Sequence, residues 1–150
     1  MNKIIIGADH GGYKLKELLQ KHLVKKGFEV IDLGTHSIDS VDYPDYAKRT
    51  AKKVLSEKNS IGILICGTGI GMSMTANKFK GIRAALCWNE KTAKLAREHN
   101  DANILCLGAR VLKKNEAVKI MNAFLKTKTS KEKRHQRRVK KMNSCGMKIN

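Results

Sequence analysis

Short apolar segments alternate with amphipathic segments along the chain, and this alternation restricts the possible folds more than any other feature of the sequence. Leucines such as Leu15 and Leu19 recur at helical spacing between the apolar segments. Strands that alternate with helices favour a parallel sheet, because parallel strands need long crossover connections. We therefore predict an α/β fold, a three-layer α/β/α sandwich of Rossmann-like type with roughly five parallel strands and a C-terminal basic helix. The predicted strands are Lys3–Ala8, Phe28–Leu33, Ser60–Cys66, Ile82–Cys87 and Asn103–Leu107.

The length and composition favour one soluble domain. A chain of 150 residues with 41% hydrophobic residues can bury one core. We expect a single domain over residues 1–143 and a flexible tail over residues 144–150. The longest apolar stretches, such as Ile61–Cys66, are far shorter than the roughly 20 residues of a membrane span. The N-terminus also lacks the apolar core of a signal peptide, so the sequence predicts a cytoplasmic protein without a membrane partner.

The cysteines and histidines give little support for a metal site. The four cysteines contain no C-x-x-C pair, so neither a zinc site nor a structural disulfide is expected. Cys87 and Cys106 lie in apolar segments and are interpreted as core residues. Asp9 and His10 are adjacent, but no other acidic residue or histidine clusters with them in sequence. We therefore predict no metal.

The ends of two predicted strands carry polar or reactive side chains. Asp9 and His10 follow the first strand, and Cys66 ends the third. In open parallel sheets, ligands bind beyond the carboxyl ends of the strands, where the strand order reverses. If both loops serve one site, the first and third strands should be neighbours in the sheet.

The segment Cys66-Gly67-Thr68-Gly69-Ile70-Gly71 is the most informative motif. Glycines between a strand and a helix let backbone N–H groups approach an anion. Met72 replaces the last glycine of a dinucleotide-binding motif, and no Gly-Lys-Ser/Thr sequence of a phosphate-binding P-loop follows. An oxyanion cradle remains. A cysteine at the start of a helix is favoured as thiolate, although a buried structural thiol is an equally good interpretation from the motif alone.

A net charge of +18 indicates either an anionic partner or a lysine-rich solvated surface. Arg134 and Arg138 are four residues apart, so both lie on one face of the predicted helix from about Ser130 to Met142 and could hold a phosphate. Arg110 follows the fifth strand. A basic nucleic-acid-binding module is an alternative, but aromatic residues make up only 5% of the chain and no recognised binding motif is present.

Several motifs, in order along the chain, resemble type B ribose-5-phosphate isomerase, whose superfamily also holds galactose-6-phosphate and allose-6-phosphate isomerases. The matching segments are Ile6–Gly12, Asp42–Pro44, Ile65–Gly71, Ala76–Lys78, Gly81–Ala84, His99–Asn103 and Arg134–Val139. The resemblance extends from the first strand to about Val139. It implies an aldose–ketose isomerase that interconverts D-ribose 5-phosphate and D-ribulose 5-phosphate through an enediolate.

The resemblance also implies a role for individual residues. Cys66 matches the proton acceptor, His99 the residue that opens the furanose ring, and Thr68 a member of the anion hole. The remaining matches contact substrate: Asp9, His10, Gly67, Gly69, Ile70, Gly71, Asn100, Arg110, Arg134 and Arg138. Met72 stands where one branch of the family has a glutamate, so this chain resembles the cysteine branch.

The resemblance also has implications for cofactors, subunit assembly and alternative substrates. No cofactor is expected, and family members form homodimers or larger homo-oligomers with active sites shared between subunits. The alternative substrates are hexose 6-phosphates, allose or galactose, because the sequence does not reveal the depth of the pocket. A catalytically inactive partner subunit is a further alternative, which the complete set of matching side chains disfavours. No specific nucleic acid is expected.

Overall fold

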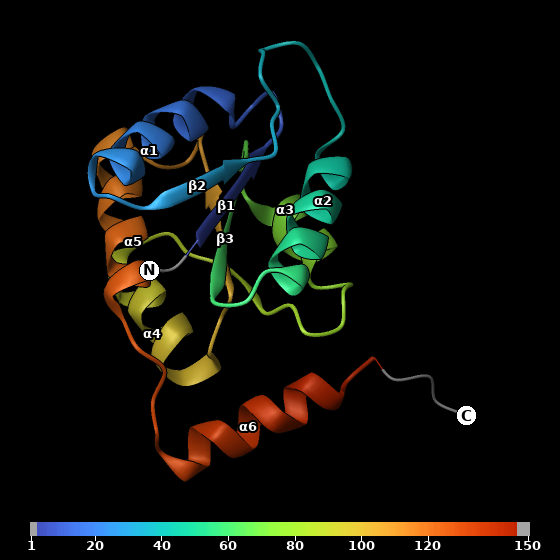
Figure 1. Ribbon diagram of the computed structural model, residues 1–150, viewed down its shortest axis with the longest axis vertical. Helices are drawn as coiled ribbons and strands as arrows, with labels where there is room; N and C mark the ends of the chain where they lie inside the picture. The colour runs from blue at the N-terminus through green and yellow to red at the C-terminus, as the bar shows by residue number, and fades with distance from the viewer. Residues whose placement is uncertain (1–2, 147–150) are drawn as a thin grey trace.

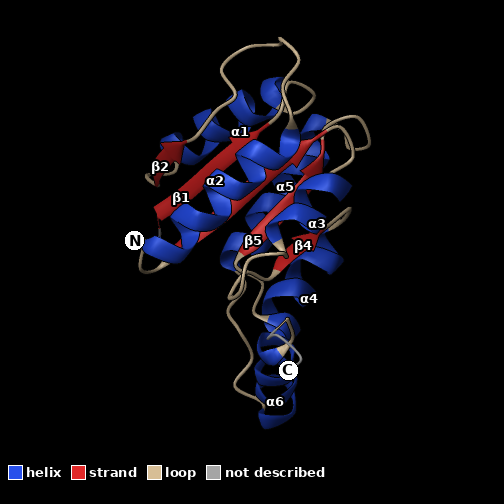
Figure 2. Ribbon diagram, turned by 90° about the vertical axis from the view of Figure 1, so that its right-hand side faces the viewer, coloured by secondary structure: helices blue, strands red, loops and turns tan. Residues whose placement is uncertain are grey.

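The computed structural model of the chain describes residues 3–146, which form one parallel sheet covered by helices on both faces (Figures 1 and 2). All pairings between its strands are parallel, and the strand order is β2-β1-β3-β5-β4. The predicted three-layer α/β/α fold is therefore confirmed. The strands are β1 (Lys3–Ala8), β2 (Glu29–Asp32), β3 (Ser60–Cys66), β4 (Ala84–Leu86) and β5 (Ile104–Gly108).

The helices divide between the two faces because the central strands are apolar on both sides. Residues of α1 (Tyr13–Lys25), α4 (Glu90–Asn100) and α5 (Lys114–Lys126) form one core cluster with the sheet. Residues of α2 (Tyr43–Ser56) and α3 (Ile70–Ala76) form the cluster on the opposite face. In Figure 1, α1 and α5 lie to the left of the sheet, and α2 and α3 lie to its right. Such two-sided burial explains the near-continuous apolar runs of the sequence.

The ends of some helices and strands differ from the predictions, in one case because a side chain makes the hydrogen bonds that another strand or helix turn would otherwise make. α3 ends at Ala76 rather than near Phe79. Asn77 caps it, and its side chain makes two hydrogen bonds with the backbone N–H and C=O of Ala84, at 2.8 and 2.9 Å. These bonds lie beside β4, which is shorter than predicted. The basic helix α6 spans Lys133–Ser144, so Ser144 belongs to it rather than to the predicted tail. Residues 147–150 of that tail lie outside the described residues.

β1 and β3 are neighbours, as a shared site at their ends requires. Ala8 of β1 pairs with Ile65 of β3, and Cys66 of β3 pairs with Gly108 of β5. The chain passes from β1 outward to β2 on one side and returns to β3 on the other side of β1. The strand order therefore reverses between β1 and β3, which is the position where open α/β sheets bind ligands.

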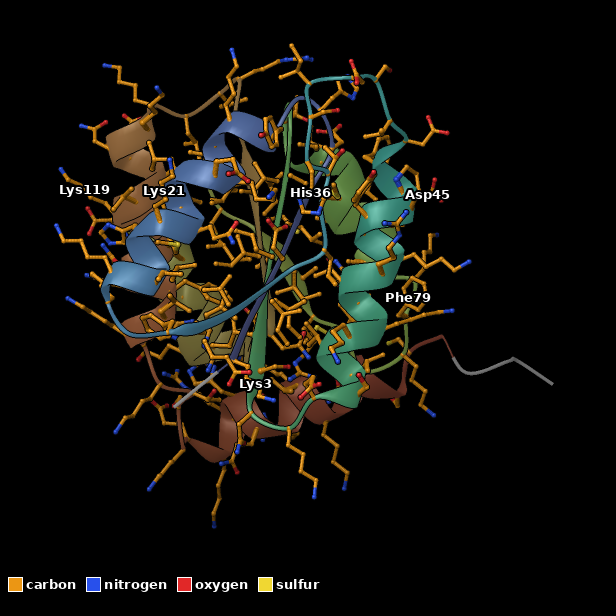
Figure 3. All side chains as sticks on the ribbon, turned by 45° about the horizontal axis from the view of Figure 1, so that its top comes forward. Lys3, Lys21, His36, Asp45, Phe79 and Lys119 are labelled. Carbon is orange, nitrogen blue, oxygen red and sulfur yellow. The ribbon has the colours of Figure 1, made fainter. Side chains whose placement is uncertain are left out.

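The basic helix α6 lies beyond the amino ends of the strands, away from the edge at which β1 and β3 end (Figure 1). It packs against α4, and the N–H of Ser130 donates to the carbonyl of Glu98 at 2.9 Å just before α6 begins. Figure 3 shows long side chains of α6 pointing away from the sheet, as Lys21 and Lys119 do on α1 and α5. No helix within residues 3–146 has the length and apolar character to cross a membrane.

Candidate active site

Asp9 and His10 occupy the loop directly after β1, and both are held by backbone N–H groups. Asp9 is 7% exposed, and its Oδ1 accepts a hydrogen bond from the N–H of Gly12 at 3.0 Å. His10 Nδ1 accepts a hydrogen bond from the N–H of Val41 at 3.1 Å. Because Nδ1 is an acceptor, a neutral His10 ring carries its proton on Nε2. The loop therefore offers one carboxylate and one N–H donor beyond the end of β1.

Cys66 ends β3 and is buried at 5% exposure. Its Sγ accepts a hydrogen bond from the N–H of Gly69 at 3.1 Å, and the N–H of Ile70 donates to Thr68 Oγ1 at 3.3 Å. The turn is possible because Gly69 adopts φ 78°, a conformation that disfavours residues with a side chain. Cys66 therefore lies just before α3, with its sulfur held by a backbone N–H group of the turn.

Arg110 lies over the glycine loops at the same edge of the sheet. A methyl group on Gly67 would lie 3.2 Å from Arg110 Nη1. A methyl group on Gly11 would lie 3.3 Å from Asp9 Oδ1 and 3.5 Å from Arg110 Nη2. The absence of side chains at Gly11 and Gly67 thus leaves room for the exposed Arg110 guanidinium beside both loops and for the buried Asp9 carboxylate beside Gly11. The edge combines a thiol, a carboxylate, a histidine and an arginine.

The loop after Cys66 also depends on Gly108, which pairs with Cys66 across the sheet. A Cβ atom at residue 108 would lie 2.6 Å from the carbonyl oxygen of Thr68 and 2.7 Å from its carbonyl carbon. We expect Gly108→Ala to push the Thr68 loop outward, to lower catalytic efficiency by about tenfold or more, and to destabilise the fold by about 1–3 kcal/mol. Steady-state kinetics and thermal unfolding measure the two effects. Gly27→Ala is the control for the kinetic effect only: no atom lies within 4 Å of its Cβ position, and its φ of 84° makes alanine there cost stability without touching the Thr68 loop. Equal kinetic losses in both variants would contradict the steric argument.

The other cysteines differ from Cys66 in their surroundings. Cys87 and Cys106 are buried, as predicted for core residues. Burial raises the pKa of the Cys87 thiol to about 11 and raises the pKa of the Cys106 thiol well above its ordinary value. Both therefore stay protonated at neutral pH and are poor bases. Cys145 is exposed after the end of α6.

The remaining predicted site residues lie at the opposite end of the sheet. α4 runs from the carboxyl end of β4 back to the amino end of β5, so His99 and Asn100 are in its last turn. A helix of 11 residues spans about 15 Å, which separates these residues from the Cys66 edge. Arg134 and Arg138 are exposed on α6 at this same end, and Arg134 Nε donates to Glu132 Oε2 at 2.6 Å. One chain thus carries two separate groups of predicted site residues.

The family described as Ribose/Galactose Isomerase matches residues 4–142. The chain belongs to the ribose/galactose isomerase family. Among its relatives, ribose-5-phosphate isomerase B of Escherichia coli is 45% identical over all of both chains. A probable ribose-5-phosphate isomerase B of Mycoplasma pneumoniae is 49% identical over 93% of this chain and 91% of its own.

Solved structures of the family share the fold. Ribose-5-phosphate isomerase B of Clostridium thermocellum superposes with a TM-score of 0.91 at 51% identity, covering 94% of this chain and 95% of its own. The enzyme of Mycoplasma genitalium, solved with bound ribulose-5-phosphate, gives a TM-score of 0.89 at 47% identity, covering 94% and 93%. The sequence-based assignment to this isomerase family and its fold is confirmed.

Several residues in the family motifs stabilise the fold rather than the site. Arg83 donates from Nε to the carbonyl of Asp101 at 2.7 Å, and its Nη2 lies 2.9 Å from the Asp101 carboxylate. Asn103 accepts from the N–H of Arg83 and donates to the carbonyl of Gly81, both at 2.8 Å. These bonds fix the start of β4 and the loop before β5. The sequence motif alone did not separate such structural residues from functional ones.

Two contacts made by residues of the family motifs were not predicted, one at each end of the sheet. The ring of Tyr43 lies against Gly71, since a Cβ there would be 2.6 Å from it. His135, which belongs to the Arg134–Val139 motif, stacks on His99. Their positions in matching motifs were the only sequence signal for either. Within residues 3–146, no three histidine, cysteine, aspartate or glutamate side chains gather in a way that could hold a metal ion.

Proposed function

We propose that this protein is an aldose–ketose isomerase that interconverts D-ribose 5-phosphate and D-ribulose 5-phosphate, with Cys66 as the proton-transfer group. The proposal depends on the groups that the structure brings together at the carboxyl ends of β1, β3 and β5. There a buried thiol that accepts an N–H bond lies between loops bearing Asp9, His10 and Arg110. The relatives that carry this enzyme name match nearly the whole chain.

The reaction needs one base that moves a proton between two neighbouring carbons. The Cys66 thiolate takes the proton from C2 of the open aldose, and the C2–H electrons form the C1–C2 double bond of an enediolate. The thiol then returns the proton to C1, while the proton of the O2 hydroxyl passes to O1 and the C2 carbonyl forms. Negative charge on the oxygens is stabilised by N–H groups of the Gly67–Gly71 turn and by Thr68. A fixed donor of this kind contributes about 3–4 kcal/mol to such transition states.

Polar groups around the thiol hold the rest of the sugar phosphate. Asp9 and the Nε2–H of His10 bind hydroxyl or phosphate oxygens, and Arg110 adds positive charge at the same edge. No step requires a metal ion or a cofactor, because proton transfer alone converts one isomer into the other. Binding energy from the phosphate, which does not react, helps to position C1 and C2 against the sulfur.

A second copy of the chain supplies the groups that this edge lacks. His99, Asn100, Arg134 and Arg138 lie at the far end of the same chain, so they complete a Cys66 site only if they come from another subunit. Exposed apolar side chains beside the Cys66 loop support such an interface: Tyr43, Ile70 and Met74 are 41%, 51% and 63% exposed. We therefore propose a cytoplasmic homodimer or larger homo-oligomer with shared sites, in which His99 opens the furanose ring and the two arginines hold the phosphate.

A substrate comparison tests the proposed specificity. We expect catalytic efficiency with ribose 5-phosphate to exceed that with allose 6-phosphate or galactose 6-phosphate by about tenfold or more, because an extra carbon must fit between fixed sulfur and phosphate positions. The measurement is steady-state turnover of each sugar by the purified single chain. Higher efficiency with a hexose would replace the pentose assignment. Absence of turnover with all three would contradict the isomerase function.

A further inference from the structure

The ring of His135 lies flat against the ring of His99. The two ring centroids are 4.1 Å apart, and the ring planes differ by 9°. His135 is on α6 and is 6% exposed, whereas His99 is partly exposed near the end of α4. Both rings line a hollow of about 360 Å³, together with residues such as Asp101, Ser130 and Val139. A parallel stack of this kind restricts rotation of the more exposed ring.

His135 is the only buried residue of α6, whose twelve residues are otherwise at least partly exposed. The stack is therefore the main buried contact through which α6 meets the end of α4. The N–H of Ser130, which donates to the Glu98 carbonyl at 2.9 Å, fixes the approach of the chain to α6. His99 is thus held from one side by a residue that is itself locked in place.

The charge state of His135 suits this role. Burial lowers the pKa of His135, and nearby His99, Arg134 and Arg138 lower it further, while Glu132 opposes them. A neutral ring faces His99 without charge repulsion. Its Nε2 is buried and has no hydrogen-bond partner within residues 3–146. The contact with His99 consequently depends on the flat ring of His135 rather than on a hydrogen bond from it.

We propose that His135 is a positioning residue that fixes the orientation of the His99 ring for opening of the furanose form of the substrate. This inference rests on the proposed function, in which His99 serves ring opening. In that step the C1–O4 bond breaks, O4 gains a proton and O1 loses one, so the direction of the imidazole N–H decides the rate. His135 itself contacts neither the sugar nor Cys66.

Comparing ribose 5-phosphate with ribulose 5-phosphate distinguishes a role in ring opening from a general structural role of His135. Ribose 5-phosphate is mainly a furanose and must be opened before its C2 proton can leave. Ribulose 5-phosphate cannot close a five-membered ring, because its C5 oxygen carries the phosphate. Exchange of its C1 hydrogen with solvent deuterium therefore reports proton transfer and phosphate binding without ring opening.

Two variants of His135 distinguish the effect of losing the flat ring from the effect of losing its nitrogen atoms. His135→Asn keeps a polar group but removes the stacking ring, and we expect it to slow ribose 5-phosphate turnover about fivefold or more. Deuterium exchange into C1 of ribulose 5-phosphate should stay within about twofold of wild type. His135→Phe keeps a flat ring and removes the unpaired nitrogen, so both rates should stay within about twofold of wild type. Thermal unfolding verifies that each variant is folded.

The comparison variant is His99→Asn, which should show the same selective loss of ribose 5-phosphate turnover as His135→Asn. Wild-type turnover in His135→Asn beside slow turnover in His99→Asn would overturn the inference and leave the proposed function standing. An equal loss of turnover and of C1 exchange in His135→Asn would also overturn it, since that pattern indicates a purely structural residue. Normal turnover in His99→Asn would remove the ring-opening role of His99, and the inference with it.

Discussion

Replacing Cys66 with serine is expected to lower turnover of ribose 5-phosphate by about 10³-fold or more, with little change in stability. The hydroxyl occupies nearly the same space as the thiol and can accept the N–H bond that Gly69 now donates to sulfur at 3.1 Å. A hydroxyl, however, loses its proton only far above neutral pH, so it cannot serve as the base for a C–H proton. Steady-state kinetics of the folded variant measure the loss.

Cys87→Ala is the matched control for this substitution. Cys87 follows β4 and is 2% exposed, so it is a buried cysteine beside the same edge of the sheet. Burial raises the pKa of its thiol to about 11, which keeps it protonated and unable to act as a base. We expect some loss of stability but turnover close to wild type. If Cys87→Ala lost as much activity as Cys66→Ser, packing rather than proton transfer would explain both.

Mixing two inactive variants is expected to restore activity, because each site of the proposed homo-oligomer would draw on two chains. Cys66→Ala lacks the base, and the double substitution Arg134→Ala with Arg138→Ala lacks the phosphate contacts. Two charge-assisted hydrogen bonds at roughly 2 kcal/mol each correspond to about a 10³-fold loss of catalytic efficiency in the double variant. In hybrid dimers, one of the two sites combines an intact Cys66 edge with an intact arginine pair. Co-expression in equal amounts should therefore recover about a quarter of wild-type activity.

The control for this experiment is co-expression of Cys66→Ala with Gly108→Ala. Both substitutions lie at the same edge of the sheet. Each site of a hybrid dimer therefore combines one altered Cys66 edge with unaltered His99 and arginine groups from the other chain. Turnover of the mixture should not exceed the turnover of Gly108→Ala alone. Recovery in the first mixture and none in the second supports sites shared between subunits. Failure of the first mixture, despite hybrid oligomers detected by mass spectrometry, would contradict the shared site.

The fold was predictable because its determinants are local. The apolar runs that became β1, β3 and β5 are buried on both faces, and the glycines at strand ends mark the turns. The neighbouring position of β1 and β3 followed from requiring one site at their ends, and the strand pairing confirms it. The boundaries of β4 and α3 were less predictable, because the side chain of Asn77, rather than another strand, makes hydrogen bonds with the backbone N–H and C=O of Ala84.

The candidate site was only partly predictable from the residues. The motif around Cys66 predicted a site at the carboxyl end of β3, and this role stays a prediction. The separation of His99 and Arg134 from that edge depends on helix direction. A helix that follows a parallel strand ends at the opposite edge of the sheet, so the end of α4 places His99 away from Cys66 of the same chain. Sites shared between subunits were predicted from the family resemblance alone. The stack between His99 and His135 joins α4 to α6 across a loop, and such contacts between distant segments leave no periodic signal in sequence.

Hydrogen exchange at C2 of ribose 5-phosphate tests the role of Cys66 most directly. In deuterium oxide, wild-type protein should label C2 as the two sugars equilibrate, because the thiol trades its proton with solvent between steps. Cys66→Ser, saturated with substrate and folded, should label C2 about 10³-fold more slowly than wild type or slower still. Labelling by the serine variant at a rate near that of wild type would show that another group takes the proton.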